Sequence, residues 1–403
     1  MTATITTMIA TPRMAWRMLV LGVAAQASGS FLVAIPAFLI PILHTQGGLT
    51  LAQAGLLAAA PNAGMVLTLV AWGAAADRYG ERWVIASGLA LASLIAAIAT
   101  VMHNNDVWLG LLFLLAGAGA ASANAASGRV VVGWFPKQRR GLTMGIRQMS
   151  QPLGQAAAAL IVLPLAGPGG IGAPIMVGAI TTGTMALACA FGIRNPPRPA
   201  APIVTGHHRE NPYLRDSFLV RIHAVSILLV VPQFALSTFG LVWLTVGLGW
   251  PVGIAGALIA ASQLIGAVGR IAVGHLSDRV NSRVRVLRWV SVAGIVAMLA
   301  LALTGFMHWG VAAGAIFIIA SSISVADNGL AFTAVAEAAG TSWSGRALGI
   351  QNTGQFLGAS AVGPCIGALM TVVGYPAAFA LIALAPLMSC GLVPRRDQHA
   401  DLG

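Results

Sequence analysis

Long apolar segments, separated by short polar breaks, run through almost the whole of this chain. A helix that crosses a bilayer needs about 20 predominantly apolar residues, and its backbone polar groups must be paired within the helix. We therefore expect an all-α membrane protein with about twelve transmembrane helices. The sequence predicts these helices near residues 16–44, 52–75, 83–102, 107–134, 142–165, 172–193, 218–246, 253–276, 285–306, 309–336, 346–372 and 375–394.

The charge content leads to the same conclusion. Only 8% of the 403 residues are charged, whereas a soluble domain carries roughly 25%, so lipid must cover most of the surface. The net charge of +12 does not indicate a nucleic-acid partner, because the basic residues punctuate apolar segments instead of forming one patch. Cys189, Cys365 and Cys390 lie inside apolar segments without CxxC spacing, so neither a metal site nor another cofactor is expected.

The longest stretch without apolar character, residues 194–217, divides the chain into an N-terminal bundle, 1–193, and a C-terminal bundle, 218–403. Arginines gather in alternate breaks, and the breaks between them, such as 45–50 and 247–251, contain no Lys or Arg. Because basic loops stay in the cytoplasm, we expect the linker and both termini on the cytoplasmic side of the cell (inner) membrane. We also expect a monomer surrounded by the lipid bilayer.

Two stretches of the first half recur in the second half. The Gly, Asp and two Arg positions of the loop after the second predicted helix recur 201 residues later, and five of ten positions in 145–154 recur 204 residues later, in 349–358. Two matches with nearly one offset indicate that six helices were duplicated with unchanged orientation. The two loop copies contain Gly73, Asp77, Arg78 and Arg82, and Gly274, Asp278, Arg279 and Arg283.

The repeated loop is expected to act as a conformational latch. A glycine lets two helices approach closely, while Asp is favoured at the amino end of a helix and Arg at the carboxyl end. Such a cluster can hold one state and release in another, and we expect Glu337 to pair with Arg279, Arg283 or Arg346 in the second copy. The alternative is a plain solvated loop whose arginines only fix the topology.

At these loop residues the chain resembles the major facilitator superfamily, whose signature loop joins the second and third helices. The length, the six-plus-six duplication and the central linker extend the resemblance over essentially the whole chain. The resemblance implies two pseudo-symmetric six-helix bundles that rock around a central site. This is the alternating-access mechanism of a secondary transporter.

Two patterns of the drug/proton antiporters in that superfamily are absent. Phe113 stands four residues before Gly117, where those proteins carry an arginine, and the fifth helix has Gln151-Pro152 where they have Gly-Pro. These departures argue against proton-driven multidrug efflux. Residues 134–148 instead resemble the cyanate permease, nitrate/nitrite porter and monocarboxylate porter branches.

Few ionised side chains remain inside the predicted helices, and each needs a partner or water because it costs about 2.5–3.5 kcal/mol on insertion scales. Arg147 and Arg270 share a depth in the cytoplasmic half of the membrane. Guanidinium groups bind carboxylates and other oxyanions in a fork, so this pair is expected to clamp a small anion; a gate or packing role is the alternative. Asp327 is a candidate for proton coupling, with a static ion pair to Arg147 or Arg129 as the alternative.

Neutral polar side chains complete the candidate binding site. Asn124 matches Asn328, and Gln148 matches Asn352, at an offset of 204 residues. Helices 1, 4, 7 and 10 line the cavity in the family that the chain resembles, but hydrogen bonds between helices are an alternative role for such groups. The candidate substrate-binding residues are Arg147, Arg270, Gln26, Asn124, Gln233, Asn328, Gln148 and Asn352.

The sequence therefore predicts a secondary active transporter of a small polar, anionic solute, with proton coupling left open. No Walker motif is present, and no catalytic triad, metal cluster or paired carboxylates occur at usable spacing, so neither ATP hydrolysis nor enzyme activity is expected. An exporter of lipophilic compounds is one alternative. A membrane sensor or partner protein that binds a ligand without transporting it is the other.

Overall fold

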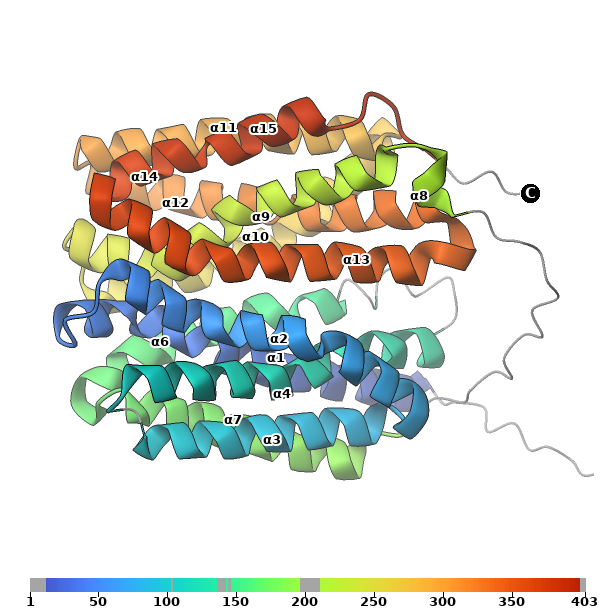
Figure 1. The fold of residues 1–403 in the computed structure, drawn as a ribbon, viewed down its shortest axis with the longest axis horizontal. Coiled ribbons are helices and arrows are strands. Elements are labelled where there is room, and N and C mark those ends of the chain that lie inside the picture. The colour runs from blue at the N-terminus through green and yellow to red at the C-terminus, as the bar shows by residue number, and fades with distance from the viewer. Residues whose placement is uncertain (1–11, 103, 136–142, 144–145, 196–210, 399–403) are drawn as a thin grey trace, which may run out of the picture.

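The computed structural model describes residues 12–102, 104–135, 143, 146–195 and 211–398. Helices make up all the regular structure within these ranges (Figure 1). Their bounds are α1 Pro12–Thr45, α2 Leu51–Tyr79, α3 Glu81–Val101, α4 Asp106–Trp134, α6 Ser150–Gly169, α7 Gly172–Gly192, α8 Pro212–Arg215, α9 Phe218–Val242, the π-helical turn η2 Trp243–Gly247, α10 Val252–Val280, α11 Arg283–Phe306, α12 Gly310–Ser324, α13 Asp327–Val373, α14 Tyr375–Ile382 and α15 Leu384–Leu392.

Twelve helical segments of the described chain are long and apolar enough to cross a membrane, which confirms the predicted all-α architecture. Three of these spans are interrupted. The seventh joins α9 to η2, the twelfth joins α14 to α15, and the tenth joins α12 to the start of α13 across a break at Val325–Ala326. Interruptions of regular helix inside a span often mark functional positions.

The first six spans and the last six form two helical bundles, which lie one above the other in Figure 1. In the N-terminal bundle α2 packs on α4 so closely that a side chain at Gly64 or Gly117 would overlap the backbone of Leu114 or Pro61. Backbone contact of this kind stabilises helix packing in lipid, where the hydrophobic effect no longer drives helices together. Large apolar side chains face outward, as at Val107, which is 81% exposed.

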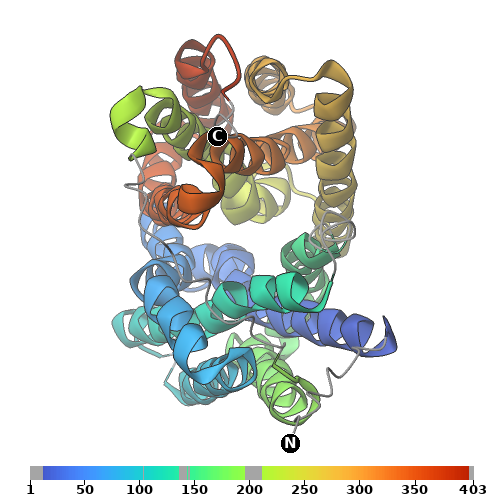
Figure 2. The same ribbon diagram turned by 90° about the vertical axis from the view of Figure 1, so that its right-hand side faces the viewer.

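Both ends of the described chain lie on one side of the molecule, the linker side, which faces the viewer in Figure 2. Arg194, after α7, lies against Met18 near the start of α1. Arg221, near the start of α9, donates a hydrogen bond of 2.9 Å to the carbonyl of Leu392, at the end of α15. The linker itself stays a prediction in its bounds, because residues 196–210 lie outside the described ranges.

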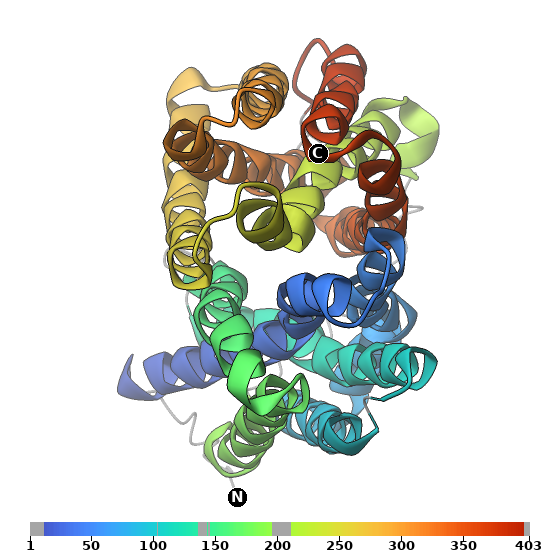
Figure 3. The ribbon, with the colours of Figure 1, turned by 90° about the vertical axis from the view of Figure 1, so that its left-hand side faces the viewer.

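The two bundles meet closely on the opposite side, the far side, which faces the viewer in Figure 3. A Cβ atom at Gly363 of α13 would overlap the carbonyl oxygen of Gly55 in α2, and the reverse substitution would overlap Gly363. The seal on this side therefore includes backbone packed directly against backbone, beside apolar side chains of both bundles. The glycines at which an added Cβ would overlap backbone of the other bundle give the pairs Gly55–Gly363, Leu51–Gly367 and Ala159–Gly256.

Replacing Gly363 with valine is expected to push α2 and α13 apart on the far side, because the added carbon atoms meet backbone that cannot rotate away. Spin labels at Gln46 and Val372, in a background without Cys189, Cys365 and Cys390, should report a longer distance, and transport should fall. The matched control is Gly349→Val in the same helix, where an added Cβ meets no atom within 4 Å. An unchanged distance distribution in the Gly363 variant would contradict this account of the seal.

Candidate functional site

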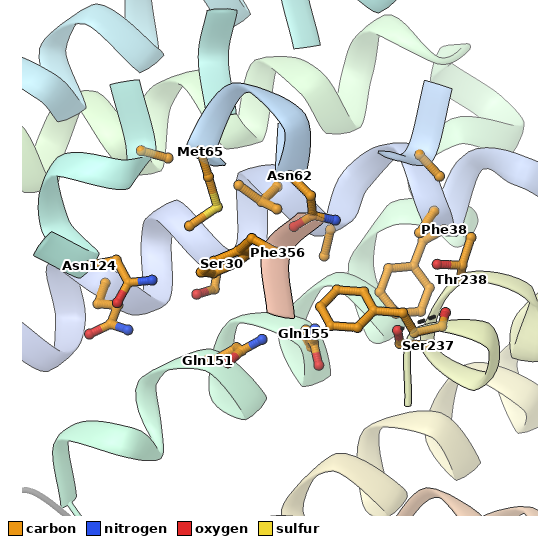
Figure 4. A pocket seen from close by; sticks show the side chains of 17 residues that line it. Ser30, Phe38, Asn62, Met65, Asn124, Gln151, Gln155, Ser237, Thr238 and Phe356 are labelled. Atoms are coloured by element: carbon orange, nitrogen blue, oxygen red, sulfur yellow. Dashed lines mark hydrogen bonds between the residues drawn. The ribbon is translucent and has the colours of Figure 1, made fainter. Parts of the chain in front are cut away.

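A central cavity lies between the two bundles and consists of two adjoining parts. The linker-side part and the far-side part share Gln26, Asn124, Gln151, Phe234 and Phe356, so they are continuous. Figure 4 shows the far-side part. The linker-side part is also lined by Gln148, Val230, Gln233, Arg270, Asn328, Phe332, Asn352 and Gln355. The far-side part is also lined by Ser30, Val33, Ala34, Ala37, Phe38, Ala58, Asn62, Met65, Ala120, Gln155, Ser237 and Thr238.

The linker-side part brings together all of the predicted binding residues except Arg147. The first half of the chain contributes from α1, α4 and the turn before α6, and the second half contributes from α9, α10 and α13. The duplication explains this convergence, because equivalent positions of two parallel repeats face each other across the axis that relates them. Contact between these side chains and a substrate stays a prediction. The residues brought together are Gln26, Asn124, Gln148, Gln233, Arg270, Asn328 and Asn352.

Arg147 is bound within the N-terminal bundle. Its Nε donates to the hydroxyl of Ser127 (2.9 Å), and one terminal nitrogen donates to the backbone carbonyl and the side-chain oxygen of Asn124 (3.0 and 3.3 Å). Ser127 in turn donates to Gln26 (2.9 Å). Arg147 therefore holds two cavity-lining carboxamides in place, while its own guanidinium is not among the groups that line the cavity.

Arg270 lies in α10 and lines the linker-side part of the cavity. Its Nε is buried and has no hydrogen-bond partner. A buried donor without a partner lowers the stability of the folded protein. The Nε of Arg270 is therefore available to a ligand that can accept a hydrogen bond. This distinguishes it from Arg147, although both residues were expected to bind the anion.

Asp327 is the first residue of α13, directly after the break in the tenth span, and its side chain is fully buried at 0% exposure. Neither carboxylate oxygen has a side-chain hydrogen-bond partner in the described chain, but the backbone N–H groups of Asp327 and Asn328, at the start of α13, stabilise the carboxylate. The carboxylate faces a separate, largely apolar pocket whose walls include Leu229, Met298 and Pro386. Asp327 also interacts electrostatically with Arg270, without the close contact of a salt bridge. Arg270, which lines the cavity, and Asp327, which lies outside it, therefore attract each other without forming a salt bridge.

Three carboxamides of the C-terminal bundle, Gln233, Asn328 and Gln355, are joined by hydrogen bonds. Asn328 donates to Gln233 (3.1 Å), and Gln355 donates to Asn328 (2.9 Å) and to Ser226 (2.7 Å). This chain of hydrogen bonds ties α9 to two parts of α13. For Gln233 and Asn328 the structure thus shows the interhelical hydrogen bonds that were the alternative reading of the sequence.

The second copy of the repeated loop contains the expected ion pair of Glu337. Arg283 donates to Asp278 at 2.5 Å and to Glu337 at 3.4 Å, so one guanidinium joins α10, α11 and α13. A third bond runs from Arg283 to Ser277 (3.0 Å). Gly274 lies one turn earlier in α10, and Gly73 has the equivalent place in α2. An added Cβ at either position would meet no atom within 4 Å, so the expected close approach of helices at these two glycines is wrong for this conformation.

The first copy of the loop differs from the second in its contacts. Arg82 donates from Nε to the carbonyl of Ala190 (2.6 Å) and from its backbone N–H to Asn195 (3.0 Å), which ties the loop to the end of α7. The guanidinium of Arg78 lies 5.3 Å from the ring centre of Tyr79. The side chain of Asp77 and that of Arg129 lie outside the described part of the structure. The latch role of both copies stays a prediction.

Replacing Arg283 with glutamine is expected to slow the transport cycle without changing the substrate Kd, because the affected bonds lie away from the central cavity. The ion pairs are partly exposed, with side-chain exposures of 23% for Arg283 and 62% for Asp278, so the loss of stability should stay near 1 kcal/mol or below. Binding and initial-rate measurements on purified protein check this. Arg285→Gln, which removes an exposed charge from the same helix, is the matched control.

The chain belongs to the major facilitator superfamily, since the model of that family matches residues 18–362. It is therefore a multi-pass membrane transporter for a small molecule and not an enzyme. An uncharacterized MFS-type transporter of Mycobacterium tuberculosis (strain ATCC 25618 / H37Rv) is 44% identical over 382 residues, which cover 94% of this chain and 85% of the relative. A hexuronate transporter of Bacillus subtilis (strain 168) is 27% identical over 122 residues, 30% of this chain and 29% of the relative.

Solved structures share the fold at low sequence identity. A bacterial homolog of the human lysosomal transporter Spinster, in an inward-facing and occupied conformation, superposes with a TM-score of 0.79 at 16% identity and covers 94% of this chain and 95% of its own. A D-xylose-proton symporter superposes with a TM-score of 0.74 at 15% identity, over 94% of this chain and 98% of its own. These similarities confirm the predicted twelve-helix architecture of the superfamily.

Proposed function

We propose that this protein is a secondary active transporter that moves a small organic anion by alternating access and couples its movement to a proton. The observation that carries the proposal is Arg270, a cavity-lining guanidinium with an unpaired, buried Nε. No carboxylate lines either part of the cavity in the described residues. A guanidinium in a cavity that no carboxylate lines favours an anionic ligand, which it binds with two parallel hydrogen bonds.

Asp327 supplies the coupling in this proposal. In the empty transporter Arg270 and Asp327 attract each other through the cavity wall, which stabilises the buried carboxylate as an anion. When an anionic substrate binds Arg270, it competes for that positive charge, and the carboxylate of Asp327 loses its electrostatic support. A buried carboxylate without a nearby positive charge is disfavoured, so Asp327 takes up a proton. Substrate and proton are then carried together.

The side of the membrane follows from the charge distribution. We place the linker side in the cytoplasm, because the predicted loops on that side carry the arginines and the far-side loops carry none. The far-side seal then makes the present conformation an inward-facing one. The similarity to a transporter solved in an inward-facing and occupied conformation supports this assignment.

The chemistry of the cavity supports a polar cargo over a lipophilic one. Carboxamides and hydroxyls line both parts of the cavity, and an apolar solute would displace water from them without replacing its hydrogen bonds. The relative from Bacillus subtilis is named for hexuronate, which is itself a carboxylate, and this agrees with an anionic cargo. The match to that relative spans only 30% of this chain, so the weight of the proposal rests on Arg270.

Uptake by the purified protein in liposomes tests the proposal. A panel of small monocarboxylates is offered with and without a pH gradient, inside acidic and outside acidic, and accumulation is followed with radiolabelled solute. We expect saturable transport of at least one carboxylate and accumulation above equilibrium only when protons can flow with it. Transport of neutral solutes alone, with no response to any anion, would show that the proposal is wrong.

A further inference from the structure

The carboxamides that line the central cavity fall into two groups. Gln26, Asn124, Gln233, Asn328 and Gln355 take part in hydrogen bonds with other side chains of the described protein. A second group has no side-chain hydrogen bond among the described residues. This second group consists of Asn62, Gln148, Gln151, Gln155 and Asn352, and all five line the cavity.

Three members of the second group form a stripe on one helix. Gln148, Gln151 and Gln155 follow one another at spacings of three and four residues, which places them on one face of the turn before α6 and of α6 itself. Gln148 lines the linker-side part, Gln155 the far-side part, and Gln151 both. The stripe thus runs along the cavity for about 10 Å, given a rise of about 1.5 Å per residue.

The far end of the stripe faces further polar groups. Figure 4 shows Gln151 and Gln155 reaching from α6 toward the space that Asn62 borders from α2, and Ser237 and Thr238 of α9 line the same part of the cavity. The rings of Phe234 and Phe356 line both parts of the cavity. The space is therefore polar along one wall and has flat apolar surfaces along another.

A carboxamide is both donor and acceptor, and so is a hydroxyl group. A row of unpaired carboxamides therefore matches a ligand that carries hydroxyl groups along its length, whose C–H faces can pack on the phenylalanine rings. An alkyl chain would leave the carboxamides without partners. An amino acid fits poorly as well, because no carboxylate lines either part of the cavity in the described residues to receive its ammonium group.

We propose that the cargo is a hydroxylated carboxylate, an aldonic or related sugar acid, with its carboxylate on Arg270 and its hydroxyl groups on Gln148, Gln151 and Gln155. This inference rests on the anion transport proposed above. In this proposal the three glutamines distinguish hydroxylated from plain carboxylates, whereas Arg270 recognises the negative charge. The charged end of the cargo points toward the linker side, since Arg270 lines only that part of the cavity.

Equilibrium binding to the purified full-length protein tests the assignment with three matched probes. Gluconate carries the charge and the hydroxyls, hexanoate has the same carbon number and charge without hydroxyls, and sorbitol has the hydroxyls without the charge. We expect gluconate, or another hydroxy acid of four to seven carbons, to bind at least tenfold more tightly than hexanoate and sorbitol. Gln151→Leu and Gln155→Leu should each weaken hydroxy-acid binding about tenfold and leave hexanoate binding unchanged.

The controls separate this inference from the function on which it rests. Gln263→Leu, in α10 and outside both parts of the cavity, should leave all three affinities unchanged. If hexanoate binds as tightly as every hydroxy acid, if no hydroxy acid binds, or if the Gln151 and Gln155 variants keep the wild-type preference, the hydroxyl assignment is wrong. If Arg270→Gln retains full binding of both acids, the anion proposal itself fails. If sorbitol alone binds tightly, both the anion proposal and the proposal of a hydroxylated acid are wrong.

Discussion

Replacing Arg270 with glutamine should abolish concentrative transport of the anion. Glutamine keeps a polar side chain of moderate length but removes the charge and the planar fork of donors, which together recognise a carboxylate. Removing one partner of a desolvated, hydrogen-bonded charge pair costs about 2–5 kcal/mol, which corresponds to a loss of at least about thirtyfold in Kd. Radiolabelled uptake into proteoliposomes and equilibrium binding measure the two quantities separately.

Two further variants test whether the effect depends on the charge and on the shape of the Arg270 side chain. Arg270→Lys restores the charge without the fork and should recover only part of the affinity. Arg221→Gln, which removes an arginine that binds the carbonyl of Leu392 on the linker side, should leave Kd unchanged. Wild-type affinity in Arg270→Gln, with correct insertion shown by unchanged thermal unfolding, would remove the central support for anion transport.

Replacing Asp327 with asparagine should uncouple transport from the proton gradient. The asparagine side chain is nearly the same size but cannot bind a proton, and the positive charge of Arg270 then has no buried counter-charge. We expect the variant to exchange internal for external substrate at a normal rate, to bind the anion more tightly than the wild type, and to lose accumulation driven by a pH gradient. Counterflow and gradient-driven uptake in the same proteoliposomes distinguish these outcomes.

The matched control for this variant is Asp278→Asn, which also neutralises one aspartate of the C-terminal bundle. Asp278 lies on the linker side and pairs with Arg283, so its neutralisation should leave the response to the pH gradient intact. Gradient-driven accumulation that survives in Asp327→Asn would show that the proton is carried elsewhere.

Much of this fold follows from hydropathy and repetition in the sequence. The spans are predictable because a helix in lipid must be long and apolar, and the duplicated loops at Asp77 and Asp278 reveal the two halves. The break at Val325–Ala326 has no comparable signal, because neither residue disfavours a helix. Just before it, the hydroxyls of Ser322 and Ser324 donate to the backbone carbonyls of Ile318 and Ser321, and hydroxyl bonds of this kind bend helices.

Sequence analysis identified most of the residues that line the linker-side part of the cavity, but it did not separate the roles of these residues. The position of Arg147 and Arg270 within predicted spans indicates that both are buried. It does not indicate which of the two binds the anion. The structure separates them, because the hydroxyl of Ser127 lies within reach of Arg147, while the Nε of Arg270 has no partner. Gln155 was not among the predicted binding residues, although its spacing from Gln148 and Gln151 is a signal that sequence analysis can use.

The glycine contact between Gly55 and Gly363 has a consequence for leakage through the protein. A barrier formed by side chains can open briefly whenever a rotamer changes, on a timescale of picoseconds to nanoseconds, but backbone atoms in contact have no such freedom. Opening the far side therefore requires whole helices to move, which takes microseconds to milliseconds. We therefore expect fast side-chain fluctuations alone not to open the contact between Gly55 and Gly363.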